Sequence, residues 1–359
     1  MGGNIDIHGL ASVSFRGECS WKEDWIGSFH DVLAIAERHV SHGARIPELV
    51  VVCEPSLPLA KARKLGEGIY VERGALIDRK YGVRLEVPDR YQLLLRAKGP
   101  CLEWLAWGMQ LVLLASGATF VHGACLENNG KAFLFPSWGG VGKTALVASL
   151  LRERDWRMLG DDLVILSRDG TSFGFPKPLV LYPYHRRLFP GVFSEGRGPV
   201  APTFANASLT RVVTLLKPLL RKFPALLQLA RAHNPQSVRL QPSSVFGDAG
   251  LCSDAKLGVT VWLERVRGLE EPEIREAKGL GSRIMGSTLL EYDPWCVRLT
   301  NVAIGLGLLN AEHVYGAWLE ILEGGLASCE QYVLDLPLDL PLTSVSTTVK
   351  ELLSAEGLI

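Results

Sequence analysis

The sequence has no excess of charge of either sign, since Lys plus Arg and Asp plus Glu each number 38 and the formal net charge is zero. Proteins dedicated to nucleic acid usually carry a basic excess, so we expect no nucleic-acid partner. The seven cysteines contain no Cys-x-x-Cys pair, and their odd number and wide spacing argue against a disulfide framework and against a zinc site. This cysteine usage favours a reducing, cytoplasmic location.

Targeting and membrane-spanning signals are also missing. The N-terminus has no basic start followed by an apolar run, so we expect no signal peptide, and Asp6 stands where a myristoylation signal has Ser or Thr. Trp104 to Cys125 is mostly apolar, but polar residues and glycines interrupt it. We therefore predict a buried helix up to about Ala115, a turn at Ser116-Gly117 and then a strand, rather than a membrane span.

The length of 359 residues is typical of two or three domains, at about 150 residues each. An apolar share of 47% excludes collagen-like, low-complexity and largely disordered chains. Lys98-Gly99-Pro100 breaks regular structure and predicts a domain boundary. We expect a smaller N-terminal α+β domain over residues 1–98, which binds a substrate or partner, and a nucleotide-binding domain over residues 99–359.

Short apolar runs bounded by turn residues predict most of the regular elements. In the first 98 residues we expect a helix over Ser28–His42 and strands at Ile46–Cys53, Tyr70–Glu72, Val83–Val87 and Tyr91–Leu95. Further on, we expect strands at Thr119–Glu127, Lys131–Phe135, Trp156–Leu159, Leu163–Leu166, Lys256–Val266 and Gln331–Leu336. Helices are expected at Ala145–Arg154 and Asn310–Gly324, and at Ser344–Ser354 with a hydroxyl residue as its cap. Asn128-Asn129-Gly130 predicts a hairpin turn.

One loop between a predicted strand and a predicted helix matches the phosphate-loop pattern of Gly, four residues, Gly-Lys and Ser or Thr, except that Ser137 replaces the first Gly. Glycines let backbone N–H groups converge on phosphate oxygens, and the helix N-terminus adds partial positive charge. We expect the nucleotide, ATP, to contact Ser137, Gly139, Gly140, Val141, Gly142, Lys143, Thr144 and Ala145. The alternative is a glycine-rich turn without a ligand.

Asp161 and Asp162 are adjacent carboxylates beside an apolar strand, an arrangement that is costly unless a metal ion or a proton is shared. A kinase needs one carboxylate for the metal and one for the proton of the acceptor hydroxyl. We expect Asp161 to act as the base and Asp162 to bind Mg²⁺ together with Thr144. The alternative is a solvated turn. His122 lies on a predicted strand and is expected either beside the phosphates or as a satisfied core group.

The order His122-Gly123, hairpin, phosphate loop, helix and Gly160-Asp161-Asp162 resembles HPr kinase/phosphorylase and its relatives over residues 101–182. These relatives include tailoring kinases of peptide and small-molecule pathways and, more distantly, the phosphoenolpyruvate carboxykinase fold. The resemblance implies an α/β fold in which helices flank a phosphate-loop core of mixed β-sheet. It also implies catalytic roles for His122, Lys143 and Asp161, and a homo-oligomer. HPr kinases carry a second signature after this region, and Ser194–Pro199 is only weakly similar to it. Glu195 is therefore a candidate site residue by resemblance alone.

Basic residues after the acidic pair are candidates for binding the acceptor. Arg186 and Arg187 follow the segment Phe175-Pro176-Lys177-Pro178, which in the relatives runs close to the active centre. Arg265 and Arg298 are similar candidates, and a solvated loop is the alternative for each. Residues 196–247 contain no Asp or Glu and are expected to form a basic helical insertion. They could be a solvated surface, a dock for an acidic partner or a contact with anionic lipid.

These features together predict an ATP- and Mg²⁺-dependent kinase acting on a hydroxyl of a peptide serine or a small-molecule alcohol. Two other functions stay open at this point. One is a nucleotide-binding regulatory module that switches a partner. The other is a carboxykinase-like enzyme acting on a carboxylate metabolite. The sequence contains no Asn-Lys-x-Asp motif for guanine, which favours ATP as the nucleotide.

Overall fold

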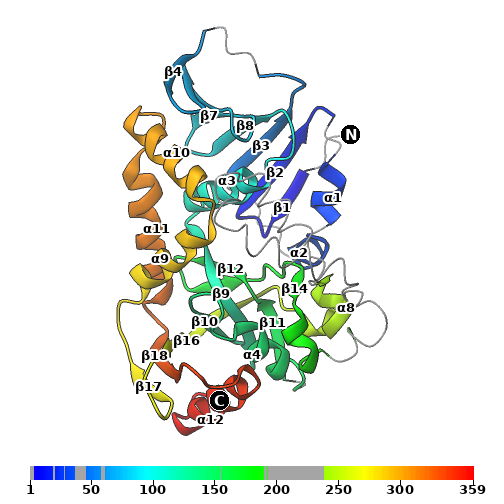
Figure 1. Cartoon of the computed structure of the whole chain (residues 1–359), viewed down its shortest axis with the longest axis vertical. Helices are drawn as coiled ribbons and strands as arrows, with labels where there is room; N and C mark the ends of the chain where they lie inside the picture. The colour runs from blue at the N-terminus through cyan, green and yellow to red at the C-terminus, as the bar shows by residue number, and fades with distance from the viewer. Residues whose placement is uncertain are drawn as a thin grey trace, which may run out of the picture. The chain divides into compact units, whose positions relative to one another are not determined.

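The computed structural model describes residues 4–18, 21–27, 29–36, 46–57, 61–153, 155–189, 192 and 238–359 (Figure 1). The chain divides into two compact units, one made of residues 1–177 and 242–359 and the other of residues 178–241. The first unit contains two large mixed sheets and the helices that cover them, so its class is mixed α/β.

The first sheet comes from the N-terminal part of the chain. Its strands are β1 (Asn4–Ile7), β2 (Ala11–Arg16), β3 (Glu48–Cys53), β4 (Arg63–Gly66), β5 (Ile69–Glu72), β6 (Ala75–Asp78), β7 (Val83–Asp89) and β8 (Gln92–Ala97). They lie in the order β1-β2-β3-β8-β7-β6-β5-β4, with the β2–β3 and β3–β8 pairs parallel. The four strands predicted here are confirmed as β3, β5, β7 and β8. Helices α1 (Lys22–Gly27) and α2 (His30–Ala36) follow β2, and the rest of the helix predicted to reach His42 lies outside the described residues.

Helix α3 (Leu102–Ala115) confirms the prediction of a buried helix that ends before Ser116. Its indole groups are buried, and their N–H groups find partners: Trp104 donates to Asp78 at 2.9 Å and Trp107 to Thr300 at 2.6 Å. The turn follows at Gly117, whose φ is +77°. Within the described ranges, no helix combines the length and apolar character needed to cross a bilayer.

The second sheet carries the candidate site. Its strands are β9 (Ala118–Asn128), β10 (Lys131–Pro136), β11 (Trp156–Gly160), β12 (Leu163–Ser167), β13 (Thr171–Phe173), β16 (Asp254–Val266), β17 (Glu273–Glu276) and β18 (Glu330–Pro337). The main order is β10-β9-β12-β13-β16-β18-β17, and β11 pairs with β9. Because β10 also pairs with β16 in parallel, the first five strands of this order form a closed circuit of pairings. All six strands predicted in this part of the chain are confirmed.

The predicted boundary near residue 98 separates two sheets rather than two compact units. Helix α3 packs against β8 of the first sheet and β9 of the second, and a single apolar core includes buried residues from both sheets. Both sheets lie in the same unit for this reason. The number and spacing of the cysteines argued against disulfides, and this prediction is wrong for Cys53, which is disulfide-bonded. The free cysteines are Cys101, Cys125, Cys252, Cys296 and Cys329.

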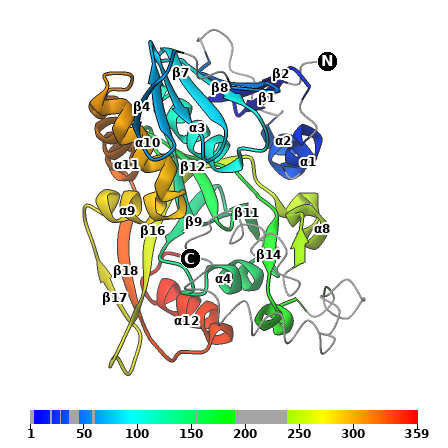
Figure 2. The same ribbon diagram turned by 45° about the horizontal axis from the view of Figure 1, so that its top comes forward.

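The remaining helices of this unit are α4 (Lys143–Leu150), α8 (Pro242–Phe246), α9 (Gly281–Glu291), α10 (Pro294–Gly305), α11 (Ala317–Leu326) and α12 (Leu342–Ala355). Four of them, α4, α9, α11 and α12, lie around the second sheet, whereas α10 packs against α3 (Figures 1 and 2). Helix α12 packs against α4, and α9 packs against β9 and α11. The helix predicted from Asn310 is a π-helical turn at Glu312–Gly316 that continues into α11. The predicted hydroxyl cap of the last helix is wrong, because the helix begins after Pro341 and makes no side-chain cap bond there.

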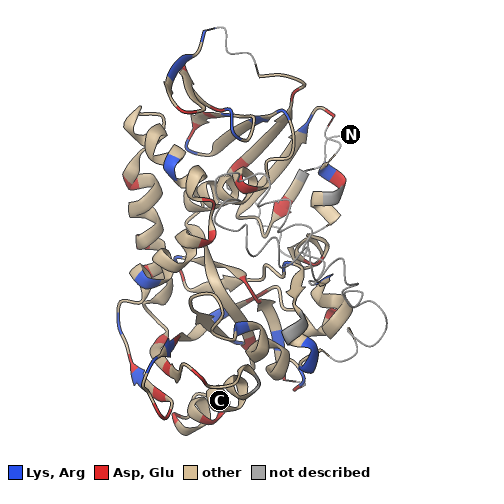
Figure 3. Cartoon of the chain, viewed as in Figure 1, with Lys and Arg blue, Asp and Glu red and all other residues tan. Residues whose placement is uncertain are grey.

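The second unit is small in its described part. Strand β14 (Leu179–Leu181) pairs antiparallel with β15 (Val238–Leu240), and a 3-10 helix covers Pro183–Arg187. Most of the acid-free stretch 196–247 lies outside the described residues, so its predicted role as a partner or lipid contact stays a prediction. On the described ribbon, basic and acidic positions are interspersed, in keeping with the balanced composition (Figure 3).

Candidate functional site

A strand and a helix lie on either side of the phosphate-loop motif as predicted, although the helix covers Lys143–Leu150 rather than Ala145–Arg154. Strands β9 and β10 form a hairpin whose turn residues Asn129 and Gly130 have φ values of +52° and +82°. Strand β10 ends at Pro136, and α4 begins at Lys143 after a six-residue loop. Gly140 and Gly142 have φ values of +82° and +122°, a conformation that favours glycine. Because glycine has no side chain, the backbone can turn at these two positions just before the helix N-terminus.

Arg265 on β16 holds this loop in place. Its guanidinium donates to the carbonyl of Val141 at 3.2 Å and to the carbonyls of Pro337 and Leu340 at 2.8 and 2.6 Å. A half-buried guanidinium that satisfies three carbonyls fixes the loop relative to the segment between β18 and α12. The sequence indicated Arg265 as a candidate for binding the acceptor, but its hydrogen bonds go to backbone carbonyls instead.

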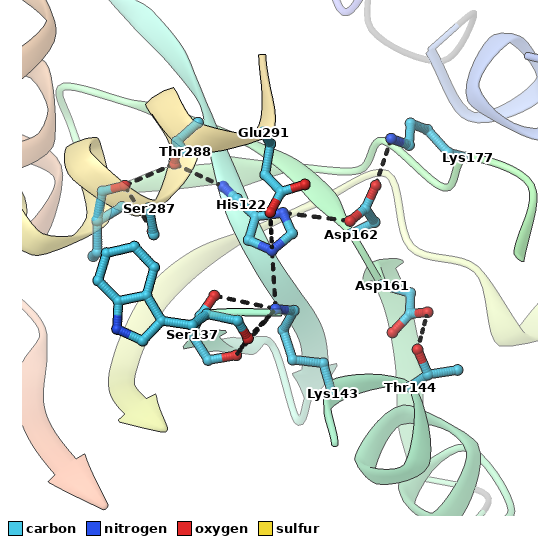
Figure 4. A network of polar contacts seen from close by, with 12 residues as sticks. His122, Ser137, Lys143, Thr144, Asp161, Asp162, Lys177, Ser287, Thr288 and Glu291 are labelled. Atoms are coloured by element: carbon cyan, nitrogen blue, oxygen red, sulfur yellow. Dashed lines mark hydrogen bonds and ion pairs between the residues drawn. The ribbon is translucent and has the colours of Figure 1, made fainter. Parts of the chain in front are cut away.

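Lys143 is buried, with 9% of its surface exposed, and its ammonium group is folded back onto the start of the loop. It donates to the Nε2 of His122 at 3.0 Å, to the hydroxyl and carbonyl of Ser137 at 3.0 and 3.2 Å, and to the carbonyl of Trp138 at 3.3 Å (Figure 4). Burial lowers the pKa of Lys143, and the carboxylates of the site partly offset that effect.

His122 lies on β9, directly beside the loop that follows β10. Its backbone N–H donates to the hydroxyl of Thr288 on α9 at 2.9 Å, which anchors the strand at this point. An ammonium group can only donate, so Nε2 of His122 is the acceptor in the contact with Lys143. Nδ1 lies 3.3 Å from a carboxylate oxygen of Asp162, without the alignment of a hydrogen bond, and Nε2 lies 3.5 Å from Glu291. His122 is therefore a buried link between Lys143 and Asp162.

The acidic pair lies at the tight turn between β11 and β12. A Cβ at Gly160 would lie 2.1 Å from the carbonyl oxygen of Leu163, so only glycine fits where the β11–β9 pairing is irregular. This turn directs the two carboxylates to different partners. Asp161 accepts a hydrogen bond from the hydroxyl of Thr144 at 2.9 Å, whereas Asp162 accepts one from the ammonium of Lys177 at 2.5 Å (Figure 4).

The two carboxylates differ in their electrostatic environment. Burial raises the pKa of Asp161 to about 6, although the hydrogen bond from Thr144 acts in the opposite direction. Burial also disfavours the charged form of Asp162, but Lys177 and His122 outweigh it and hold the pKa of Asp162 well below its usual range. Half of the Asp162 side chain is exposed, at 49%. Asp162 is thus a charged group whose side chain is half exposed.

The oxygen atoms of Asp161 fit a divalent cation. Its Oδ1 atom is buried and has no hydrogen-bond partner among the described residues, and its Oδ2 atom lies beside the Thr144 hydroxyl. Hard oxygen ligands of this kind suit Mg²⁺, which is usually held by one or two carboxylates together with water and substrate phosphates. In the part of the chain that the structure describes, no three His, Cys, Asp or Glu residues form a complete metal-binding group.

The structure brings His122, Ser137, Lys143, Thr144, Asp161 and Asp162 together at one place (Figure 4). Of the other predicted nucleotide contacts, Val141 and Ala145 are buried, while Gly139 and Gly140 are exposed in the loop. Arg186 and Arg187 are exposed and belong to the second unit, and Glu195 lies outside the described residues. Arg298 lies over the ring of Trp295 on α10, at 5.4 Å from the ring centroid.

Three residues of the site were not predicted as such. Lys177 has no sequence signal beyond its place in a Pro-containing segment, and Thr288 and Glu291 lie on α9, more than a hundred residues after the loop. The spacing of Thr288 and Glu291 by three residues places both on one helical face. That spacing is common in helices, so only the packing of α9 on β9 identifies these residues.

Comparisons with known proteins add little to this geometry. No protein-family profile matches the chain, and no curated protein sequence matches it. Among solved structures, the chain is similar to one described as the HPr(Ser) kinase/phosphatase from Coxiella burnetii, with 8% identity and a TM-score of 0.29. The match covers 67% of this chain and 99% of that chain. At this level the likeness carries no argument about function.

Proposed function

We propose that this chain is a kinase that uses ATP and Mg²⁺ to phosphorylate a hydroxyl group, either of a serine in a peptide or of a small-molecule alcohol. One observation carries the proposal. A glycine loop at a helix N-terminus presents Lys143 and Thr144 next to two carboxylates that have separate partners, Asp161 and Asp162. Phosphoryl transfer needs a phosphate cradle, a metal-binding carboxylate and a carboxylate for the acceptor hydroxyl.

Thr144 and Asp161 are the residues that would hold Mg²⁺, because they share a hydrogen bond and Asp161 keeps a buried oxygen without a partner. When bound, the ion would neutralise charge on the phosphates. The sequence predicted the opposite division, with Asp162 at the metal and Asp161 as the base. We now propose the reverse assignment, since Thr144 contacts Asp161 and the side chain of Asp162 is half exposed.

The remaining residues act on the transferred phosphate and the acceptor. The loop amides and Lys143 bind the β and γ phosphates, and His122 orients Lys143 through its Nε2. Asp162 accepts a hydrogen bond from the acceptor hydroxyl. As the bond from the acceptor oxygen to the γ phosphorus forms, the bond from that phosphorus to the bridging oxygen of ADP breaks. The hydroxyl proton passes to Asp162. Because the transition state is loose, this proton moves late, and a weak base is sufficient to accept it.

Transfer of labelled γ-phosphate tests the proposal. Wild type and Asp162→Asn are incubated with labelled ATP, Mg²⁺ and a panel of acceptors: free serine, other hydroxyl metabolites, short serine peptides and the HPr protein. Asp169→Asn is the matched control, because Asp169 also pairs with a lysine but is exposed on a turn. Label in an acceptor with wild type and the control, but not with Asp162→Asn, supports the kinase. Nucleotide binding without any transfer would favour a regulatory module instead.

A further inference from the structure

Ser137 stands where the phosphate-loop pattern has glycine, and its side chain makes specific contacts. The residue is completely buried, and its backbone forms an isolated parallel bridge with Leu263 of β16. Its hydroxyl donates to the carbonyl of Trp138 at 3.0 Å and accepts from the ammonium of Lys143 at 3.0 Å. The bridge to Leu263 fixes the backbone of Ser137, and the contacts with Trp138 and Lys143 fix the orientation of its hydroxyl.

The ammonium of Lys143 has more acceptors than protons. It carries three N–H groups, and four acceptor atoms lie within 3.3 Å: His122 Nε2, Ser137 Oγ, Ser137 O and Trp138 O. Two of these are backbone carbonyls that any residue in the loop would supply. The Ser137 hydroxyl is different, because a glycine at this position would not provide it. A phosphate oxygen that approaches Lys143 therefore competes with these four acceptors for three N–H groups.

We propose that Ser137 is a positioning residue that holds Lys143 in a resting orientation, so that the β and γ phosphates of a nucleotide must compete with its hydroxyl for the ammonium group. This inference rests on the proposed nucleotide-binding function of the loop. Binding at this site is weakened for every nucleotide that reaches Lys143 and is unchanged for one that does not. Hydrogen bonds to a charged group are strong, so removal of the Ser137 hydroxyl should change the Kd of such a nucleotide by a measurable amount.

Binding of ATP and AMP to Ser137→Ala tests this inference, since AMP lacks the phosphates that reach Lys143. Alanine keeps the backbone conformation and removes only the hydroxyl, and circular dichroism checks that the variant is folded. We expect the Kd for ATP to fall about threefold to tenfold and the Kd for AMP to stay the same. An unchanged Kd for ATP would overturn the inference. A higher Kd for ATP would also overturn it, because the hydroxyl would then be a phosphate ligand.

A double-mutant cycle shows whether Ser137 acts through Lys143. In the Lys143→Met background, which has no ammonium group, Ser137→Ala should leave the Kd for ATP unchanged. The same gain in both backgrounds would overturn the proposed route through Lys143. Ser354→Ala, an exposed position on α12, is the matched control and should bind ATP as wild type does.

A further measurement needs no nucleotide and so separates this inference from the proposed function. Acetic anhydride acylates amines, and mass spectrometry of the peptide that contains Lys143 gives its modification rate. We expect Ser137→Ala to accelerate acylation of Lys143 about threefold or more, because the Ser137 hydroxyl no longer holds the Lys143 side chain, whose amine is the group that attacks the anhydride. An unchanged rate would contradict the resting contact. If no variant binds any nucleotide while Lys143 still reacts faster in Ser137→Ala, the contact holds and the proposed function fails.

Discussion

The hydroxyl of Thr144 donates a hydrogen bond to Asp161 and not to its neighbour Asp162, with 2.9 Å between Oγ1 and Oδ2. Asp162 accepts instead from Lys177, and Gly160 makes possible the turn that carries both carboxylates. Two adjacent residues of the same type are therefore given different partners by the backbone. This separation is the basis of the roles proposed for the pair, and it leads to the first prediction.

Asparagine substitutions in the acidic pair should have different effects. Asp161→Asn is expected to raise the Mg²⁺ concentration for half-maximal transfer by more than about tenfold, because it removes a charged ligand. Asp162→Asn should lower kcat by about a hundredfold or more at saturating Mg²⁺, because it removes the proton acceptor. Titration of the transfer rate with Mg²⁺ measures both values. A changed Mg²⁺ requirement in Asp162→Asn alone would restore the assignment predicted from the sequence.

The buried Asp161 carboxyl should make stability depend on pH when no divalent cation is present. Its pKa is raised to about 6 in the folded chain, so the folded state binds the proton more tightly than the unfolded state. The resulting stabilisation is complete below about pH 4, the ordinary pKa of Asp, and is lost as the pH rises through about 6.

The expected loss is on the order of 2 kcal/mol between pH 4 and pH 6.5, relative to Asp161→Asn, which does not titrate. Denaturant unfolding of both proteins in EDTA measures this difference at each pH. Parallel stability curves for the two proteins would show that Asp161 has an ordinary pKa.

Lys177 should be needed for transfer rather than for nucleotide binding. Lys177→Met leaves Asp162 without its cation beside the incoming phosphates, so kcat is expected to fall about tenfold or more. Lys177→Arg should recover part of the rate because it keeps the charge. Turnover measured alongside the Kd for ADP separates the two effects. Lys256→Met is the control, since Lys256 pairs with exposed Asp169 at 2.6 Å. An equal loss in both variants would argue against a specific role for Lys177.

Removing the guanidinium of Arg265 should weaken both the fold and the loop. Arg265→Ala leaves the carbonyls of Val141, Pro337 and Leu340 without this donor, and we expect a loss of about 2–3 kcal/mol in the free energy of unfolding. The Kd for ATP should also rise, because Val141 lies in the loop. Arg275→Ala removes an exposed arginine on β17 and should change neither value. A loop that binds ATP normally without Arg265 would contradict the supporting role.

Glycine at position 160 should be essential for the turn that holds the acidic pair. Gly160→Ala places a Cβ 2.1 Å from the carbonyl oxygen of Leu163, and we expect it to cost more than about 3 kcal/mol in the free energy of unfolding. Gly286→Ala is the matched control, because a Cβ there meets nothing within 4 Å. That variant should gain about 0.5–1 kcal/mol, since alanine favours a helix interior. Denaturant unfolding checks both, and a stable Gly160→Ala would refute the close approach.

Local patterns in the sequence determined much of the second sheet and the centre of the site. Alternating and continuous apolar runs predicted its strands, Asn129-Gly130 predicted the hairpin, and Gly142-Lys143-Thr144 predicted the loop ahead of α4. These signals are local, because backbone preferences of glycine and asparagine and the periodicity of apolar side chains act over a few residues. For that reason short motifs were enough to identify Lys143, Thr144, Asp161 and His122 as candidate site residues.

Tertiary packing decided what local patterns could not specify. Glu291 and Thr288 approach His122 only because α9 packs on β9, and Arg265 supports the loop only because β16 runs parallel to β10. The roles proposed for Asp161 and Asp162 likewise depend on a side-chain contact, since adjacent residues give no sequence signal of which one meets Thr144. Contacts between residues far apart in the chain depend on how the sheets and helices pack. The sequence alone therefore determined the chemistry available at the site, and the tertiary structure determined which residue faces which.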